Sequence, residues 1–167
     1  MKTKLNQSKL KLAIVSAMLL GTAAITAPAY ALDESLSVSA SIGTACTIST
    51  TTLAFSSYDA VGANASADLL AQGGVTSTCS IGSSGHIKMS QGLHADADSS
   101  DGTPLRRMVH STNATSFLSY RVFSDSARSL VWENTTGVAY NGTGSDETLT
   151  VYGSVTQAQT DAIVGSY

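Results

Sequence analysis

The two cysteines are the residues whose type and spacing point most directly to chemistry. Cys46 and Cys79 are the only cysteines in the 167-residue chain. They lie too far apart for the CxxC spacing of a redox or metal site. In an oxidising compartment such a pair forms a disulfide by default. We therefore predict a Cys46–Cys79 bridge, which stabilises the fold by about 3–4 kcal/mol because it closes a loop of about 33 residues.

An acidic run, DADSSDG at 96–102, superficially resembles a calcium-binding loop. The EF-hand pattern requires glycine at position six and glutamate at position twelve. Counting from Asp96, these positions hold Asp101 and Arg107. The run is therefore interpreted as a solvated acidic loop, and no metal site is predicted.

The three histidines, His86, His94 and His110, were considered as metal ligands or as catalytic bases. None has HxH or HExxH spacing, and no serine lies in a GxSxG motif. A Ser-His-Asp arrangement assembled in space stays a minor alternative. We predict no enzyme activity, no catalytic residue and no cofactor.

The first 31 residues have the pattern of a secretory signal peptide. An apolar run at 12–26 follows four lysines, and small residues at Ala29 and Ala31 have the spacing that signal peptidase recognises. The apolar run is too short for a spanning segment of about 20 residues. We predict cleavage before Leu32 and export through the periplasm to the cell surface.

The exported part, 32–167, is acidic and rich in hydroxyl side chains. It holds five basic and twelve acidic residues, a net charge of −7, and 41 of its residues are Ser or Thr. Nucleic acids and anionic membranes require clustered Lys and Arg, so neither is an expected partner, and no membrane insertion is expected. Disorder is the minor alternative, because a disordered stalk would carry more proline.

Short runs of alternating apolar and polar residues recur along the chain, with turn residues between them. The strongest, 116–125, places Leu118, Tyr120 and Val122 on one side. Further strands are expected within 46–55, 73–81, 86–92, 129–134 and 147–155, loops at 92–104 and 135–147, one helical turn in 156–165, and core positions at Tyr120, Trp132 and Tyr152. This pattern predicts a single all-β sandwich domain.

The run SLSVSASIGTAC, 35–46, alternates strictly at the start of the exported chain. Leu36, Val38, Ala40 and Ile42 share one face, and serines occupy the other. The run is either the first strand of the chain's own sheet or a strand that pairs with another molecule. Alternation alone does not separate the two.

Several blocks resemble the spore coat protein U domain family. They are CTISTTTLAFSSYD (46–59), GGVTSTCS (73–80), LRRMVH (105–110), LSYRVFSDSARSLVWEN (118–134), TVYGSV (150–155) and QAQTDAIVGSY (157–167). Members include secreted coat proteins and the subunits of archaic, Csu-type chaperone–usher pili.

The resemblance implies an incomplete immunoglobulin-like sandwich, 46–167, with an N-terminal donor-strand extension, 32–45. It also implies three partners: a periplasmic pilus chaperone, an outer-membrane usher and further subunits of the same polymer. The donor side chains would be Leu36, Val38, Ala40 and Ile42, with Cys46 and Cys79 as the disulfide.

In the family the GxY step is followed by a final strand of about ten residues, whereas this sequence stops at Tyr167. We therefore expect either a fragment or a truncated product in which one wall of the acceptor groove is missing.

Together these features predict a secreted, non-enzymatic pilus subunit that polymerises by donor-strand exchange for surface attachment and biofilm formation. The alternative is a secreted coat protein or a β-sandwich glycan-binding module that uses the loops at 92–104 and 135–147.

Overall fold

A computed structural model describes residues 36–167 of the chain. The predicted signal peptide, 1–31, lies outside these residues. The described part forms no helix and seven strands: β1 (Cys46–Thr51), β2 (Leu69–Cys79), β3 (Ser84–Ile87), β4 (Arg106–His110), β5 (Asn113–Phe123), β6 (Val138–Asn141) and β7 (Asp146–Val155). Within it no helix is long and apolar enough to span a membrane. The all-β prediction is confirmed.

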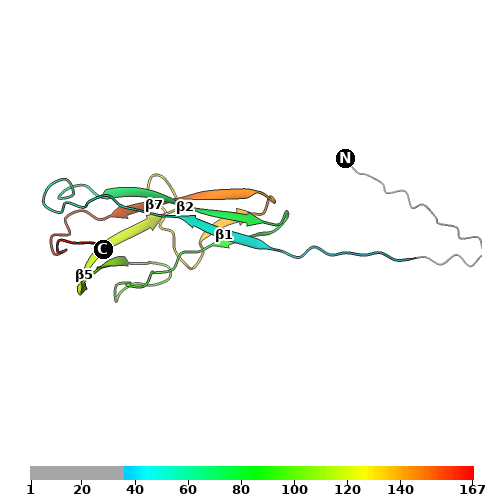
Figure 1. Cartoon of the computed structure of the whole chain (residues 1–167), viewed down its shortest axis with the longest axis horizontal. Helices are drawn as coiled ribbons and strands as arrows, with labels where there is room; N and C mark the ends of the chain where they lie inside the picture. The colour runs from blue at the N-terminus through cyan, green and yellow to red at the C-terminus, as the bar shows by residue number, and fades with distance from the viewer. Residues whose placement is uncertain (1–35) are drawn as a thin grey trace, which may run out of the picture. The chain divides into compact units, whose positions relative to one another are not determined.

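The strands form two antiparallel sheets of unequal size. The large sheet has the order β1-β2-β7-β5-β4, and the small sheet pairs β3 with β6. Figure 1 shows β1, β2 and β7 side by side in the large sheet. A two-stranded layer facing a five-stranded one is an incomplete β-sandwich, as predicted.

The hydrophobic core lies between the two sheets. Val75, Val122 and Val151 of the large sheet pack with Ile87 of β3 and with Trp132. Trp132 is 1% exposed. Its indole Nε1 donates a hydrogen bond to Ile87 O (2.8 Å), and its backbone N–H donates to Val122 O (2.9 Å). One buried side chain therefore ties the small sheet to the large one.

A buried arginine closes the sandwich beside β4. Arg106 is 4% exposed and donates hydrogen bonds to the carbonyl oxygens of Met89, Ser90 and Trp132 at 2.8–3.0 Å. Burial lowers the pKa of its guanidinium. Nη1 has no partner within the described residues. The alternation of β4 thus places a cation, rather than an apolar residue, at the rim of the core.

Three expected elements differ from the structure. The strand expected at 86–92 is β3, which ends at Ile87. The run 129–134 forms only a bridge between Val131 and Phe123, because the chain leaves the β5 edge there to enter the small sheet. β6 lies inside the predicted loop 135–147, because four residues flanked by glycines give too short a pattern to recognise.

The segment 156–165 forms turns rather than the predicted helical turn. The Gln159 amide does reach back to Thr156 O (2.9 Å), but it also accepts from Ser119 N–H (2.7 Å) and donates to Ser119 O (3.0 Å). Gln159 thereby takes the place of a strand residue beyond Val155, where β7 ends. This tertiary pairing outweighs the local preference for a helix.

Tyr152 is not a core residue, contrary to the prediction. It follows Val151 in β7, so its side chain lies on the opposite face of the sheet. The Arg128 guanidinium carbon lies 5.7 Å from the centre of its ring.

Candidate assembly interface

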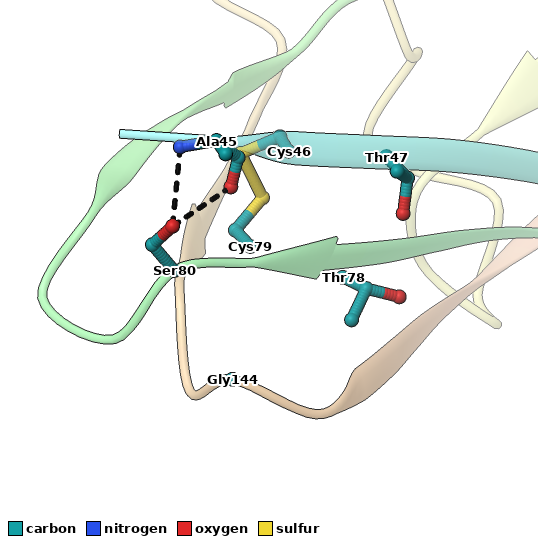
Figure 2. A pocket seen from close by; sticks show the side chains of 7 residues that line it. All are labelled: Ala45, Cys46, Thr47, Thr78, Cys79, Ser80 and Gly144. Atoms are coloured by element: carbon teal, nitrogen blue, oxygen red, sulfur yellow. Dashed lines mark hydrogen bonds between the residues drawn. A yellow bond between two sulfur atoms is a disulfide. The ribbon is translucent and has the colours of Figure 1, made fainter. Parts of the chain in front are cut away.

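The point where the N-terminal segment joins the sandwich is held by a disulfide and a serine. Cys46 lies directly opposite Cys79 in the β1–β2 register, and their sulfurs are bonded as predicted. Ser80 is the next residue, and Figure 2 shows its hydroxyl beside the backbone of Ala45. Ala45 N–H donates to Ser80 Oγ (3.1 Å), while Ser80 N–H and Oγ–H donate to Ala45 O (2.9 and 3.2 Å). Position 45 is therefore fixed to the end of β2.

A shallow cavity of about 320 Å³ lies at this junction. It is drawn in Figure 2 and is lined by Ala45, Cys46, Thr47, Thr78, Cys79, Ser80 and Gly144. Its two cysteines are oxidised and its other residues carry no ionisable side chain. The lining of this cavity is therefore uncharged.

β1 is an uncovered edge strand. Its six residues, CTISTT, are all exposed and carry no charge. Because Ala45 directs its N–H and C=O toward Ser80, the alternation of a strand turns those of Cys46, Ile48 and Thr50 to the free edge. The Ile48 side chain lies on the core face of the sheet, opposite Ser77, yet it is 64% exposed. An uncharged edge of this kind is a template for an added strand.

The chain after β1 continues this open edge across the core face. The backbone of 52–57 forms no hydrogen bond within the described part of the chain. Leu53 and Phe55 are half-buried and alternate with exposed residues, and both pack on the backbone of Gly153 in β7. A Cβ at Gly153 would lie 2.8 Å from atoms of both side chains, so a side chain there would displace the segment. The segment is thus a layer over the large sheet that lacks a pairing strand.

The core beside this segment is incompletely covered. Six apolar side chains pack against the core cluster but stay partly exposed: Leu53, Met89, Tyr120, Val138, Tyr140 and Leu149. These side chains come from both layers of the sandwich. Apolar area at the margin of the core is therefore left uncovered within the described residues.

The opposite edge strand of the large sheet, β4, carries charged side chains that contact neighbouring segments. Beside β4, the Arg107 guanidinium donates to Asp96 Oδ2 (2.9 Å) and to Ala95 O (2.9 Å), which holds the loop 92–104 near that edge. At the other end of β4, His110 Nε2 lies 3.2 Å from Val164 O. Of the two edge strands of the large sheet, β1 is the one without charged side chains, which are what blunts an edge against pairing.

The residues predicted as donor side chains lie in two units, Met1–Ala40 and Ser41–Tyr167, which are described separately. In the first, the described residues 36–40 form no strand, and Leu36 and Val38 are 89% and 85% exposed. In the second, residues 41–45 form no strand, and Ile42 is 94% exposed. Within its own unit, each of these side chains is exposed and lies in a segment that forms no strand.

The other residues considered for chemistry do not converge. His94 lies beside Phe117, and His110 packs edge-on against Tyr167. No group of three or more His, Cys, Asp or Glu side chains that could hold a metal is found among residues 36–167.

Two carboxylates, Asp125 and Glu133, are used locally to hold turns. Hydrogen bonds from Thr135, and then from backbone N–H groups up to Gly137, lower the pKa of Glu133 to about 2. Those from Leu130 and Ser129 lower the pKa of Asp125. Both therefore act as turn anchors.

Residues 32–167 match the Spore Coat Protein U domain. The chain belongs to the Spore Coat Protein U domain family. It is also similar to "Protein U" of Myxococcus xanthus, with 34% identity over 163 residues, which cover 93% of this chain and 90% of that protein. The family is one of structural coat and pilus domains associated with chaperone–usher systems.

The sequence did not predict that 52–57 is an unpaired segment lying over the large sheet. The run 46–55 was expected to be a single strand, but it divides into β1 and the unpaired segment. The signal that could have shown the division is the pair of glycines in β2 and β7, Gly73 and Gly153. Glycine inside a strand indicates a close approach by another segment. The backbone of Thr51 and Leu53 approaches Gly73, and the side chains of Leu53 and Phe55 approach Gly153.

Proposed function

We propose that this protein is a non-enzymatic structural subunit that polymerises by strand exchange. Residues 36–42 of one copy pair along part of the open edge of the next copy, which comprises Cys46–Thr51 and 52–57. The observation that carries the proposal is the asymmetry of the large sheet, whose β4 edge carries arginines and contacts the loop 92–104, while its β1 edge is unpaired and uncharged.

Donor and acceptor have complementary chemistry. The donor places Leu36, Val38, Ala40 and Ile42 on one face, and the acceptor presents unpaired backbone groups beside partly exposed core side chains. Burial of the four donor side chains is worth on the order of 5–8 kcal/mol before ordering costs. New main-chain hydrogen bonds add to this.

An open edge of this kind is an aggregation hazard before assembly. We therefore propose that a periplasmic chaperone covers it after export and that an outer-membrane usher exchanges the chaperone for the next subunit. The product is a thin surface filament for attachment and biofilm formation.

The proposal is tested with two matched charge substitutions in the full exported chain. Val38→Asp places a carboxylate on the apolar face of the donor, and Ser37→Asp places the same charge on its serine face. Analytical ultracentrifugation is expected to show polymers for the wild type and S37D, and loss of polymers for V38D. Equal assembly of both variants, or a stable wild-type monomer with 36–42 paired in its own sheet, contradicts the proposal.

A further inference from the structure

A second hollow, of about 220 Å³, lies far from the open edge, between β4, β5 and the start of the C-terminal segment. It forms because β7 pairs with β5 only as far as Val155 opposite Tyr120. At the next outward-facing position, Ser119, the ladder is continued by the Gln159 amide rather than by a strand. The hollow stays open because β7 has ended at Val155 and the Ser119 side chain is too small to fill the space.

Three arginines line this hollow on an otherwise acidic domain, and one of them has an uncommitted guanidinium. Three of the five basic residues in 32–167 line it: Arg106, Arg107 and Arg121. The Arg106 guanidinium is committed to the core carbonyls. Arg107 is balanced by Asp96 and stacks on Phe117, with its guanidinium carbon 4.2 Å from the ring centre. Arg121 is exposed and forms no hydrogen bond or ion pair within the described chain.

Two hydroxyls beside Arg121 are also uncommitted. Ser119 and Thr156 line the hollow, and the hydroxyl of neither residue forms a hydrogen bond with the described residues. A free guanidinium matches a carboxylate through two parallel hydrogen bonds. Free hydroxyls donate to and accept from other hydroxyls. Asp96 at the wall disfavours a ligand with several negative charges.

We propose that this hollow binds a carboxylated sugar, such as the uronate unit of an acidic polysaccharide. The carboxylate pairs with Arg121, and the sugar hydroxyls bond with Ser119 and Thr156. The site is independent of strand exchange, because it lies by β4 and β5, whereas exchange uses the β1 side. In a filament the repeated sites would bind a polymeric ligand with avidity.

The test is isothermal titration of the full exported chain with a galacturonate oligosaccharide at low salt. Arg121→Gln removes the free cation, and Ser119→Leu fills the hollow. Both are expected to weaken binding at least about tenfold, since a hydrogen bond to a charged group is worth about that much. Lys88→Gln, which removes one charge from an exposed residue outside the hollow, is expected to leave the affinity unchanged.

Two ligand controls separate sugar recognition from simple anion binding. A neutral galactose oligosaccharide of the same length is expected not to bind, and acetate is expected to compete only at far higher concentration. Equal binding of the neutral sugar, equal competition by acetate, or unchanged affinity in R121Q overturns the proposal. Circular dichroism of R121Q and S119L verifies that both variants are folded, and R121Q alone decides the result if S119L is not.

Discussion

Ser80 binds both backbone polar groups of Ala45, the residue that leads from the N-terminal segment into the first strand. Its hydroxyl accepts from Ala45 N–H at 3.1 Å and donates to Ala45 O at 3.2 Å, and its backbone N–H donates to the same oxygen at 2.9 Å. Together with the adjacent disulfide, this contact fixes the position at which the proposed donor segment joins β1.

Replacing Ser80 by alanine is expected to make the backbone at Ala45 less firmly held. S80A loses the hydrogen bonds of the hydroxyl but keeps the backbone hydrogen bond to Ala45 O. We therefore expect the free energy of unfolding to fall by about 0.5–1.5 kcal/mol. Hydrogen exchange at the Ala45 amide should accelerate in S80A. Ser145→Ala is a matched control, because the Ser145 hydroxyl forms no hydrogen bond in the described chain. Equal exchange at Ala45 in both variants contradicts the assignment.

Removal of the disulfide is expected to lower the free energy of unfolding by about 3–4 kcal/mol. The reason is that the unfolded chain is then no longer constrained by a closed loop of about 33 residues. The comparison is urea unfolding of the oxidised protein against the Cys46→Ala/Cys79→Ala variant. A difference below about 1 kcal/mol would show that the unfolded chain is already compact near the bridge.

Arg106→Leu is expected to destabilise the fold by about 3 kcal/mol or more. It leaves the carbonyls of Met89, Ser90 and Trp132 without their donor at the rim of the core. Arg121→Leu removes the same charge from an exposed site and should change stability by less than about 0.5 kcal/mol. Thermal unfolding of both variants shows whether the loss of stability comes from the buried position of Arg106 or from the loss of a positive charge.

Glu133 should stabilise the fold in a pH-dependent way. Its pKa is lowered to about 2 from an ordinary value of 4.5. Its contribution is therefore complete above pH 4.5 and is lost as the pH falls toward 2. The stability difference between wild type and Glu133→Gln, measured by urea unfolding from pH 7 to pH 2, should be constant at first and then shrink below pH 4.5. A difference that does not change over this range would mean that the turn does not use the charge.

The sequence was a good guide where pattern and covalent chemistry act locally, and a poor one where the partner is distant. The alternation in 116–125 predicted β5, and the cysteine pair predicted the bridge. The unpaired segment 52–57 was missed because its conformation depends on Gly153, about a hundred residues away. Tyr152 was misassigned because it was taken as core for its aromatic side chain, although the alternation of Val151 and Val155 places it on the other face of the sheet. The open hollow at Ser119 depends on where β7 ends, which local sequence does not specify.

The most direct test of strand exchange is hydrogen exchange at the backbone amides of the open edge, Cys46–Thr51 and 52–57. In the assembled wild-type protein, residues 36–42 of the next subunit are predicted to protect the open-edge amides that they face, which lie among Cys46, Ile48, Thr50 and 52–57. In V38D these amides are predicted to exchange rapidly, while the amides of β2 and β7 stay protected in both. Equally rapid exchange at the open edge in wild type and V38D would contradict the account.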